Sequence, residues 1–134
     1  MSNAVLDLQA ALLAYLRGQA SLAVWLGAPA RVYDQPPVEV LYPYVTFGRV
    51  SAQCIGGVGT DVTEQVLNLM CVSRFGGSEE AKAMAAELRL LLDGAALDLA
   101  GLVSLRVSYV DVFRSADQRT TYALVRLRAV TEAI

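Results

Sequence analysis

Apolar residues recur about every three or four positions in two parts of the chain, which is the spacing of one helix face. The first part starts at Ser2 or Asn3, either of which can cap a helix, and runs to Arg17 before Gly18. Its apolar side is formed by Val5, Leu8, Leu12 and Tyr15 or Leu16. A short helical piece follows over 20–26. The second long helix is capped by Ser78 and stopped by Gly94, and its packing side is formed by Ala81, Met84, Ala85, Leu88 and Leu92.

Elsewhere apolar and polar residues alternate, which is the pattern of strands. A short strand is predicted over 31–34, before the break at Pro36 and Pro37. Long strands are predicted over 44–54 and 63–75, and again over 102–114 and 120–131, each pair joined as a hairpin. The order helix, hairpin, helix, hairpin predicts an α+β fold in which an antiparallel sheet of two long hairpins carries helices on one face. We expect residues 1–134 to form a single domain.

Both faces of the predicted sheet are apolar. Alternation puts Leu105, Val107 and Tyr109 on the face that meets the helices, together with Ala123, Val125, Leu127 and Ala129. The other face should be polar if water covers it, yet it mixes apolar residues with tyrosine and arginine, as protein interfaces do. We therefore predict a subunit or partner interface at Met70, Val72, Arg106, Val110, Val112, Arg114, Tyr122, Leu124, Arg126 and Arg128. Two alternatives remain open: a terminal segment or the first helix covers this face, or it is exposed with scattered apolar residues.

A glycine-rich segment joins the strands of the first hairpin. It contains Gly56, Gly57, Val58, Gly59 and Thr60. A phosphate-binding loop would need a lysine and a following helix, whereas here a strand follows. We expect a flexible hairpin tip that can dock to a partner protein.

Composition narrows the possible functions. Of the 134 residues, 55% are hydrophobic and 18% are charged, which argues against disorder and suggests apolar surface for another subunit to cover. The net charge of −2 lacks the basic excess of a nucleic-acid-binding protein. Lys82 is the only lysine; the arginine bias suits either codon usage or interfaces. No apolar run is long enough to span a bilayer and no secretory signal is apparent, so we expect synthesis in the cytoplasm and no membrane partner.

Histidine, the commonest general base and metal ligand, is missing from the sequence. Neither a Ser-His-Asp triad nor a Cys-His pair can therefore form. Its acidic residues are scattered, and no spacing suggests a paired carboxylate site. Cys54 and Cys71 do not have zinc-site spacing, and we expect both to be buried free thiols on strands, with a disulfide between paired strands as the alternative. We therefore predict a protein that is not an enzyme and needs no cofactor or metal; a small-ligand pocket between sheet and helices is the alternative.

Four segments give the chain a family resemblance over nearly its whole length. They are Arg31-Val32-Tyr33-Asp34, then Tyr42-Pro43-Tyr44-Val45-Thr46-Phe47-Gly48, then Val72-Ser73-Arg74 with Gly77-Ser78-Glu79-Glu80-Ala81, and finally Thr120-Thr121-Tyr122 through Arg126 to Glu132. In their order and spacing they resemble the phage tail-completion, or tail-terminator, family, which includes the tail terminator of gene transfer agents.

The resemblance implies a structural protein of a virion or phage-like particle. It would form a hexameric ring at the head-proximal end of the tail tube. Its partners would be copies of itself, the major tail tube protein and a neck or stopper protein, and DNA would pass through the lumen without specific binding. Another neck or tube subunit, such as a stopper, is the alternative within the same setting.

Overall fold

Asn3 begins the first helix by accepting a hydrogen bond at Oδ1 from the backbone N–H of Leu6, 3.2 Å away. The computed structural model describes residues 3–57, 59 and 61–133, so Ser2, the other expected cap, lies outside the described residues. The elements are α1 (Ala4–Arg17), the 3-10 helix η1 (Ala20–Leu22), α2 (Ala23–Leu26), β1 (Val32–Tyr33), β2 (Tyr44–Cys54), β3 (Val62–Ser73), α3 (Glu79–Leu92), β4 (Leu102–Arg114) and β5 (Thr121–Glu132).

The start of α3 differs from the expected cap. Ser78 occupies the N-cap position, but among the described residues its side chain makes no capping hydrogen bond. Glu80, in the first helical turn, instead accepts a hydrogen bond from Ser73 Oγ at the end of β3, over 2.8 Å. This contact ties the helix to the strand that precedes it. Gly94 follows the helix with a φ of 76°, which suits glycine better than any other residue.

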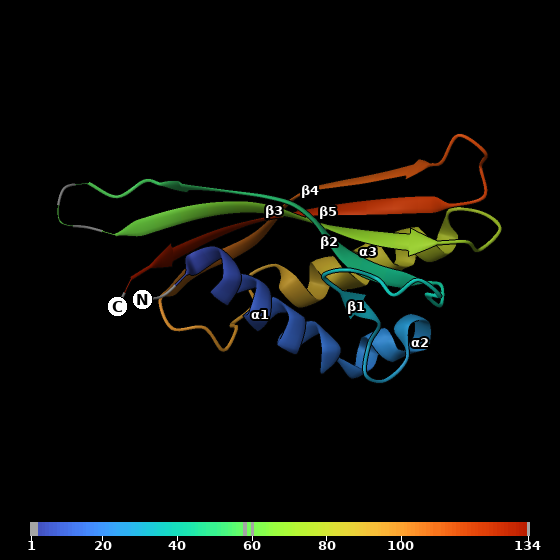
Figure 1. Cartoon of the computed structure of the whole chain (residues 1–134), viewed down its shortest axis with the longest axis horizontal. Helices are drawn as coiled ribbons and strands as arrows, with labels where there is room; N and C mark the ends of the chain where they lie inside the picture. Colours follow the sequence, from blue (N-terminus) through green and yellow to red (C-terminus); the bar gives the residue numbers. More distant parts are fainter. Residues whose placement is uncertain (1–2, 58, 60, 134) are drawn as a thin grey trace.

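The strands form one five-stranded sheet in the order β1-β2-β3-β5-β4. The two predicted hairpins, β2–β3 and β4–β5, are confirmed, and they join side by side through the antiparallel pair β3–β5. The short β1 adds to the outer edge of β2 in parallel. The predicted α+β class is therefore confirmed (Figure 1).

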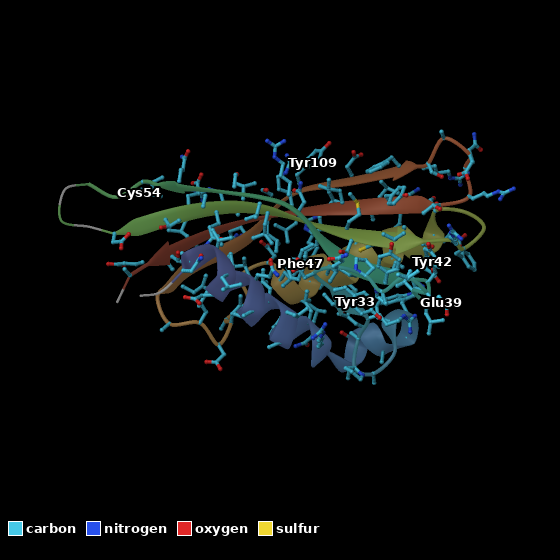
Figure 2. The ribbon with its side chains drawn as sticks, in the orientation of Figure 1. Tyr33, Glu39, Tyr42, Phe47, Cys54 and Tyr109 are labelled. Carbon is cyan, nitrogen blue, oxygen red and sulfur yellow. The ribbon has the colours of Figure 1, made fainter. Side chains whose placement is uncertain are left out.

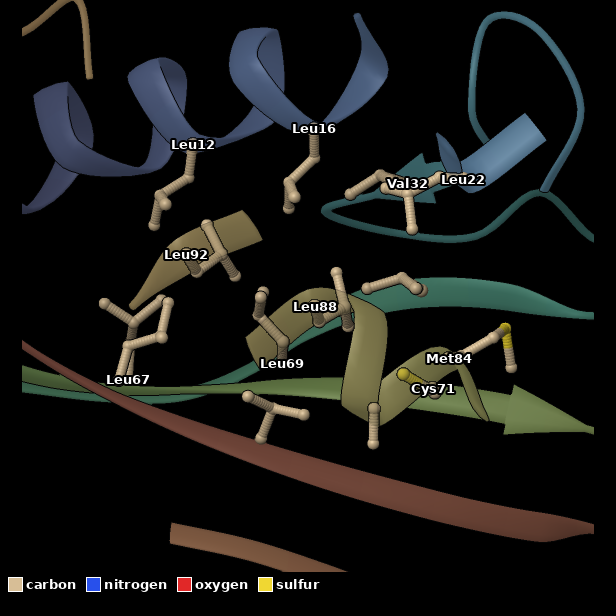
Figure 3. Packing of buried hydrophobic residues seen from close by; sticks show 14 of the residues in the cluster. Leu12, Leu16, Leu22, Val32, Leu67, Leu69, Cys71, Met84, Leu88 and Leu92 are labelled. Atoms are coloured by element: carbon tan, nitrogen blue, oxygen red, sulfur yellow. The ribbon is translucent and has the colours of Figure 1, made fainter. Parts of the chain in front are cut away.

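Both long helices lie on the same face of the sheet. α3 packs on β3, β5 and β4, and Figure 1 shows α1 on that side too. Figure 3 shows Leu12 and Leu16 of α1 pointing toward Leu88 and Leu92 of α3, above Leu69 of β3. Tyr15 of α1 also donates a hydrogen bond to the carbonyl of Leu91 in α3, over 2.7 Å. The first helix therefore does not cover the opposite face, which removes one alternative to an interface.

Register shifts interrupt the pairing of β2 and β4, and β4 has two of them, between Leu102 and Ser104 and between Val107 and Tyr109; the second one corrects the predicted faces. In β4 the register runs from Val107 beside Leu127 to Tyr109 beside Arg126, so Ser108 is an extra residue that reverses the alternation beyond it. Tyr109 therefore lies on the face away from the helices, and Val110, Val112 and Arg114 lie on the helix side, contrary to the expectation. The shift in β2, between Phe47 and Val50, likewise turns Val50 to the helix side, where it lies beside Leu67.

Candidate interaction surface

The sheet face turned away from the helices is called the open face here. One row of neighbouring residues crosses four strands on it: Tyr44, Val72, Tyr122 and Phe113. Val72 is only 4% exposed, because it sits between neighbours with large side chains rather than under a helix. The next row contains Thr46, Met70, Leu124 and Asp111, of which Met70 and Leu124 are half-buried. The predicted interface residues Met70, Val72, Tyr122 and Leu124 therefore lie together.

Aromatic rings dominate this end of the open face. Phe113 and Tyr122 stack with ring centroids 5.3 Å apart and planes 27° from parallel. Tyr42 and Tyr44 make a tilted pair at 5.4 Å, and the guanidinium of Arg74 lies 4.4 Å from the centroid of the Tyr42 ring. These rings form an apolar surface with polar hydroxyl groups, a composition common at the centre of protein interfaces.

The environment of Tyr44 also affects its hydroxyl. Partial burial raises the pKa of Tyr44 above its ordinary value of 10.0, and the neighbouring Tyr42 and Tyr122 raise it further, while Arg74 lowers it. The hydroxyl is therefore protonated at neutral pH and available as a hydrogen-bond donor to a partner.

The arginines of the open face are held by neighbouring side chains. Arg126 donates from Nε to Asn68 Oδ1 over 3.1 Å, and its guanidinium lies 5.0 Å from the centroid of the Tyr109 ring. Arg128 forms an ion pair with Glu64 on the adjacent β3, donating from Nε to Oε2 over 2.8 Å. Glu64 balances the charge of Arg128, whereas the contacts of Arg126 orient its guanidinium without neutralising it.

The side chain of Arg106 does not stay on the open face, where the sequence pattern placed it. Arg106 is the register neighbour of Arg128, yet its Nε lies 3.3 Å from Asp93 Oδ1 at the end of α3. The backbone N–H of Val107 donates to the same oxygen over 3.0 Å. The side chain thus turns around the edge of the sheet toward the helix layer, and more than half of it remains exposed.

Val110 and Val112 line a groove on the helix side, between the edge strand β4 and α3. The groove has a volume of about 710 Å³, and its α3 wall includes Lys82, Ala86, Arg89 and Leu90. Arg114 is exposed at the end of β4. The predicted interface set is thus divided by the β4 bulge between two surfaces, the open face and this groove.

The hairpin tip lies far from the aromatic end. Figure 1 shows β2 and β3 running past the helices before the chain turns. Gly56, Gly57 and Gly59 belong to this turn, and Gly59 has a φ of 83°; Val58 and Thr60 lie outside the described residues. Docking of this loop to a partner stays a prediction.

The two cysteines differ in exposure. Cys71 is buried in the core beside Val45 and Ala123, as expected, and burial raises the pKa of its thiol to about 12. Cys54 is exposed, contrary to the expectation, because it lies near the end of the projecting hairpin, beyond the helix layer. Both are free thiols.

Sequence reasoning about faces missed the aromatic end of the molecule. Tyr33 packs against Tyr44 with ring centroids 6.2 Å apart, on the same ring that pairs with Tyr42, and Figure 2 shows Tyr33 and Tyr42 at this end of the molecule. Arg31 supports this end by donating from Nε to the Pro43 carbonyl over 3.1 Å and from Nη2 to the Trp25 carbonyl over 2.9 Å. The only available signal was that these residues belong to segments of the family resemblance.

The described part of the chain has neither a cluster of metal-binding side chains nor a helix suited to crossing a membrane. Over residues 3–57, 59 and 61–133, no three histidine, cysteine, aspartate or glutamate side chains are grouped so that they could hold a metal ion. The helices in the same part of the chain are too short or too polar to cross a membrane.

Solved structures provide two comparisons. A chain from the virion of a native gene transfer agent particle is 29% identical to this one; the match covers 98% of this chain and 100% of that chain, with a TM-score of 0.88. A second structure is 19% identical, covers 100% of this chain and 97% of its own, and has a TM-score of 0.54, which shows a shared fold. No curated protein matches the chain.

A family model gives a further match. The model for tail completion protein gp17 matches residues 10–132, which include every strand and α3. This confirms the resemblance seen in the sequence, and the setting agrees with the gene transfer agent particle that contains the similar chain. The chain belongs to the family of tail completion protein gp17, a family of structural proteins of phage-type tails.

Proposed function

We propose that this protein is the tail terminator of a phage-like particle, forming a ring that ends the tail tube and joins it to the neck. The open face carries the argument, because the Tyr44–Val72–Tyr122–Phe113 row presents stacked aromatic rings on a sheet surface that α1 and α3 leave uncovered. A surface of this composition favours burial against another protein. The similar chain in the gene transfer agent virion and the family match support the tail as the setting.

The proposed partners follow from this position. Copies of the chain would form the ring, with six subunits expected from the resemblance, and the ring would contact the major tail tube protein on one side and a neck or stopper protein on the other. DNA would pass through the lumen without specific binding, in keeping with the ion pair of Arg128 with Glu64. The role needs no catalytic step.

Tube growth in the presence of the protein tests this function. Purified tail tube subunits are polymerised with and without the protein, and tube lengths and ends are measured by negative-stain microscopy. We expect shorter tubes of defined length that carry a ring at one end. Tubes of unchanged length whose ends never carry the protein would sink the proposal, and binding only to neck components would favour a stopper-like role instead.

A further inference from the structure

The groove between α3 and β4 is open and mostly apolar, and two cations lie along it. Val110 and Val112 form its β4 side and Leu90, 79% exposed, lies on its α3 side. Lys82 and Arg89 also line it, and in the described part of the chain neither has a carboxylate within ion-pair distance. The one acid among the groove's lining residues, Asp93, already forms an ion pair with Arg106 and accepts a hydrogen bond from the Val107 N–H. The groove therefore suits a segment that is apolar and negatively charged.

The loop between β1 and β2, residues 34–43, has that chemistry. It contains Asp34 and Glu39 and no lysine or arginine. Val38 is fully exposed and Leu41 is 68% exposed, flanking Glu39 on either side. Pro36 and Pro37 restrict the backbone, which lowers the entropy lost when such a loop binds. Exposed apolar residues on a stiff acidic loop are what a groove of apolar and cationic side chains would accept.

The loop and the groove lie at opposite edges of the sheet and at the same level along its strands. The loop lies beside the β1–β2 edge, and the groove lies along the opposite edge strand, β4. One row of neighbours, Val32, Val45, Cys71, Ala123 and Val112, runs across all five strands from one edge to the other. Val112 in the groove is thus level with Val45, two residues after the loop ends. Figure 2 shows Glu39 and Tyr42 at the same end of the molecule, opposite Cys54 on the projecting hairpin.

We propose that the α3–β4 groove of one subunit receives the 34–43 loop of a second copy of this chain, with Glu39 facing Arg89 and Lys82. Because the two surfaces differ and lie at opposite edges, each copy can donate its loop to one neighbour and accept the loop of another. A contact of this kind is head-to-tail, and it forms a ring when the rotation between neighbouring subunits closes on itself. The inference deepens the proposed terminator function and rests on it for the ring, while the open face remains available to other tail proteins.

Charge reversal tests the contact. The wild type, Glu39→Arg, Arg89→Glu and the double variant are compared by sedimentation velocity and native mass spectrometry over a range of concentrations. Each single reversal should weaken self-association by at least about tenfold, because like charges would then meet in the groove. The double variant should restore it. Arg119→Glu, an exposed reversal in the turn between β4 and β5, is the matched control and should associate like the wild type.

The possible results distinguish a failure of the groove contact from a failure of the proposed terminator function. A wild type that stays monomeric at every concentration, singles that associate normally, or a double variant that stays weak would each overturn the contact. Thermal unfolding of every variant shows that the fold persists. If the wild type ends tail tubes but Arg89→Glu does so equally well, the groove contact fails and the terminator function stands. If the double variant rescues association but no protein ever ends a tube, the contact stands and the function fails.

Discussion

Val72 is almost fully buried beside Tyr122, on the sheet face that α1 and α3 leave uncovered. Side chains from the sheet itself remove it from water, so the open face carries a small apolar cluster of its own. A cluster of this kind holds its rings in place before any partner arrives. Pre-formed rings lose less entropy on binding than freely rotating side chains would, which favours association through this face.

Leu124→Asp should weaken assembly while leaving the chain folded. Leu124 is half-buried in the row next to Val72, so a carboxylate there can still reach water, and we expect a loss of about 1–2 kcal/mol in the free energy of unfolding. Binding to tube ends should fall much more, because the partner would have to bury the charge. Urea titration and tube-end counting by microscopy measure the two effects.

The control for this variant is Ser51→Asp, which adds the same charge to the open face on the projecting part of β2. It should leave assembly unchanged. An unfolded Leu124→Asp would mean that this part of the face belongs to the core. Normal assembly by a folded Leu124→Asp would remove the residue from the interface.

Arg31→Met should destabilise the fold. Arg31 is half-buried and donates to the carbonyls of Pro43 and Trp25, and methionine would leave both acceptors without this partner. Hydrogen bonds from a charged group contribute about 1.5–3 kcal/mol, so we expect a loss of about 2–4 kcal/mol in the free energy of unfolding. The urea midpoint measures it. Arg49→Met, at an exposed position on β2, is the control and should shift stability by less than about 0.5 kcal/mol. Equal midpoints for the two variants would contradict the role of Arg31.

The two thiols should react at very different rates. A disulfide reagent added to the native protein should modify the exposed Cys54 rapidly and leave Cys71 untouched until the chain unfolds. Absorbance of the released reagent should therefore report one thiol in buffer and two in denaturant. Cys54→Ser should report none in buffer. Rapid reaction of that variant would show that Cys71 is accessible in the native state.

Stability should decline at alkaline pH through Cys71. Its folded pKa is about 12, whereas a thiol in an unfolded chain titrates near about 8.5. Between these values the unfolded chain binds fewer protons than the folded one, so the free energy of unfolding falls as pH rises. The stabilisation that comes from keeping the Cys71 thiol protonated is intact below about pH 8.5. Above that pH the free energy of unfolding falls with a slope that approaches about 1.4 kcal/mol per pH unit. Urea titrations at several pH values, on the wild type and Cys71→Ala, should give curves that converge as pH rises; parallel curves would argue against this effect.

Much of the fold could be predicted because local signals agreed with one another. Asn3, Gly18 and Gly94 fell where helices begin or end, and the two hairpins followed from alternation. The position of β1 was harder to foresee, because parallel pairing of a two-residue strand depends on contacts distant in sequence.

The candidate surface was only partly predictable. Alternation placed Met70, Val72, Tyr122 and Leu124 correctly, because β3 and β5 pair without a register shift. It failed for Tyr109, Val110, Val112 and Arg114, since a bulge has no strong signal in sequence and reverses every position after it. The aromatic cluster escaped because Tyr42 and Tyr44 meet Arg74 and Tyr122 only through tertiary pairing.

The same bulge is one place where β4 can change length. Ser108 has no register neighbour on β5, and its hydroxyl donates to the Arg126 carbonyl over 3.3 Å. Deleting Ser108 would leave Tyr109 beside Arg126 and Val110 beside Val125, with every later side chain on its present face. Deleting a residue between Val110 and Phe113 would exchange the faces of the rest of the strand. During evolution, position 108 is therefore one place where this strand can gain or lose a residue without exchanging its two faces; the other register shift, between Leu102 and Ser104, is another.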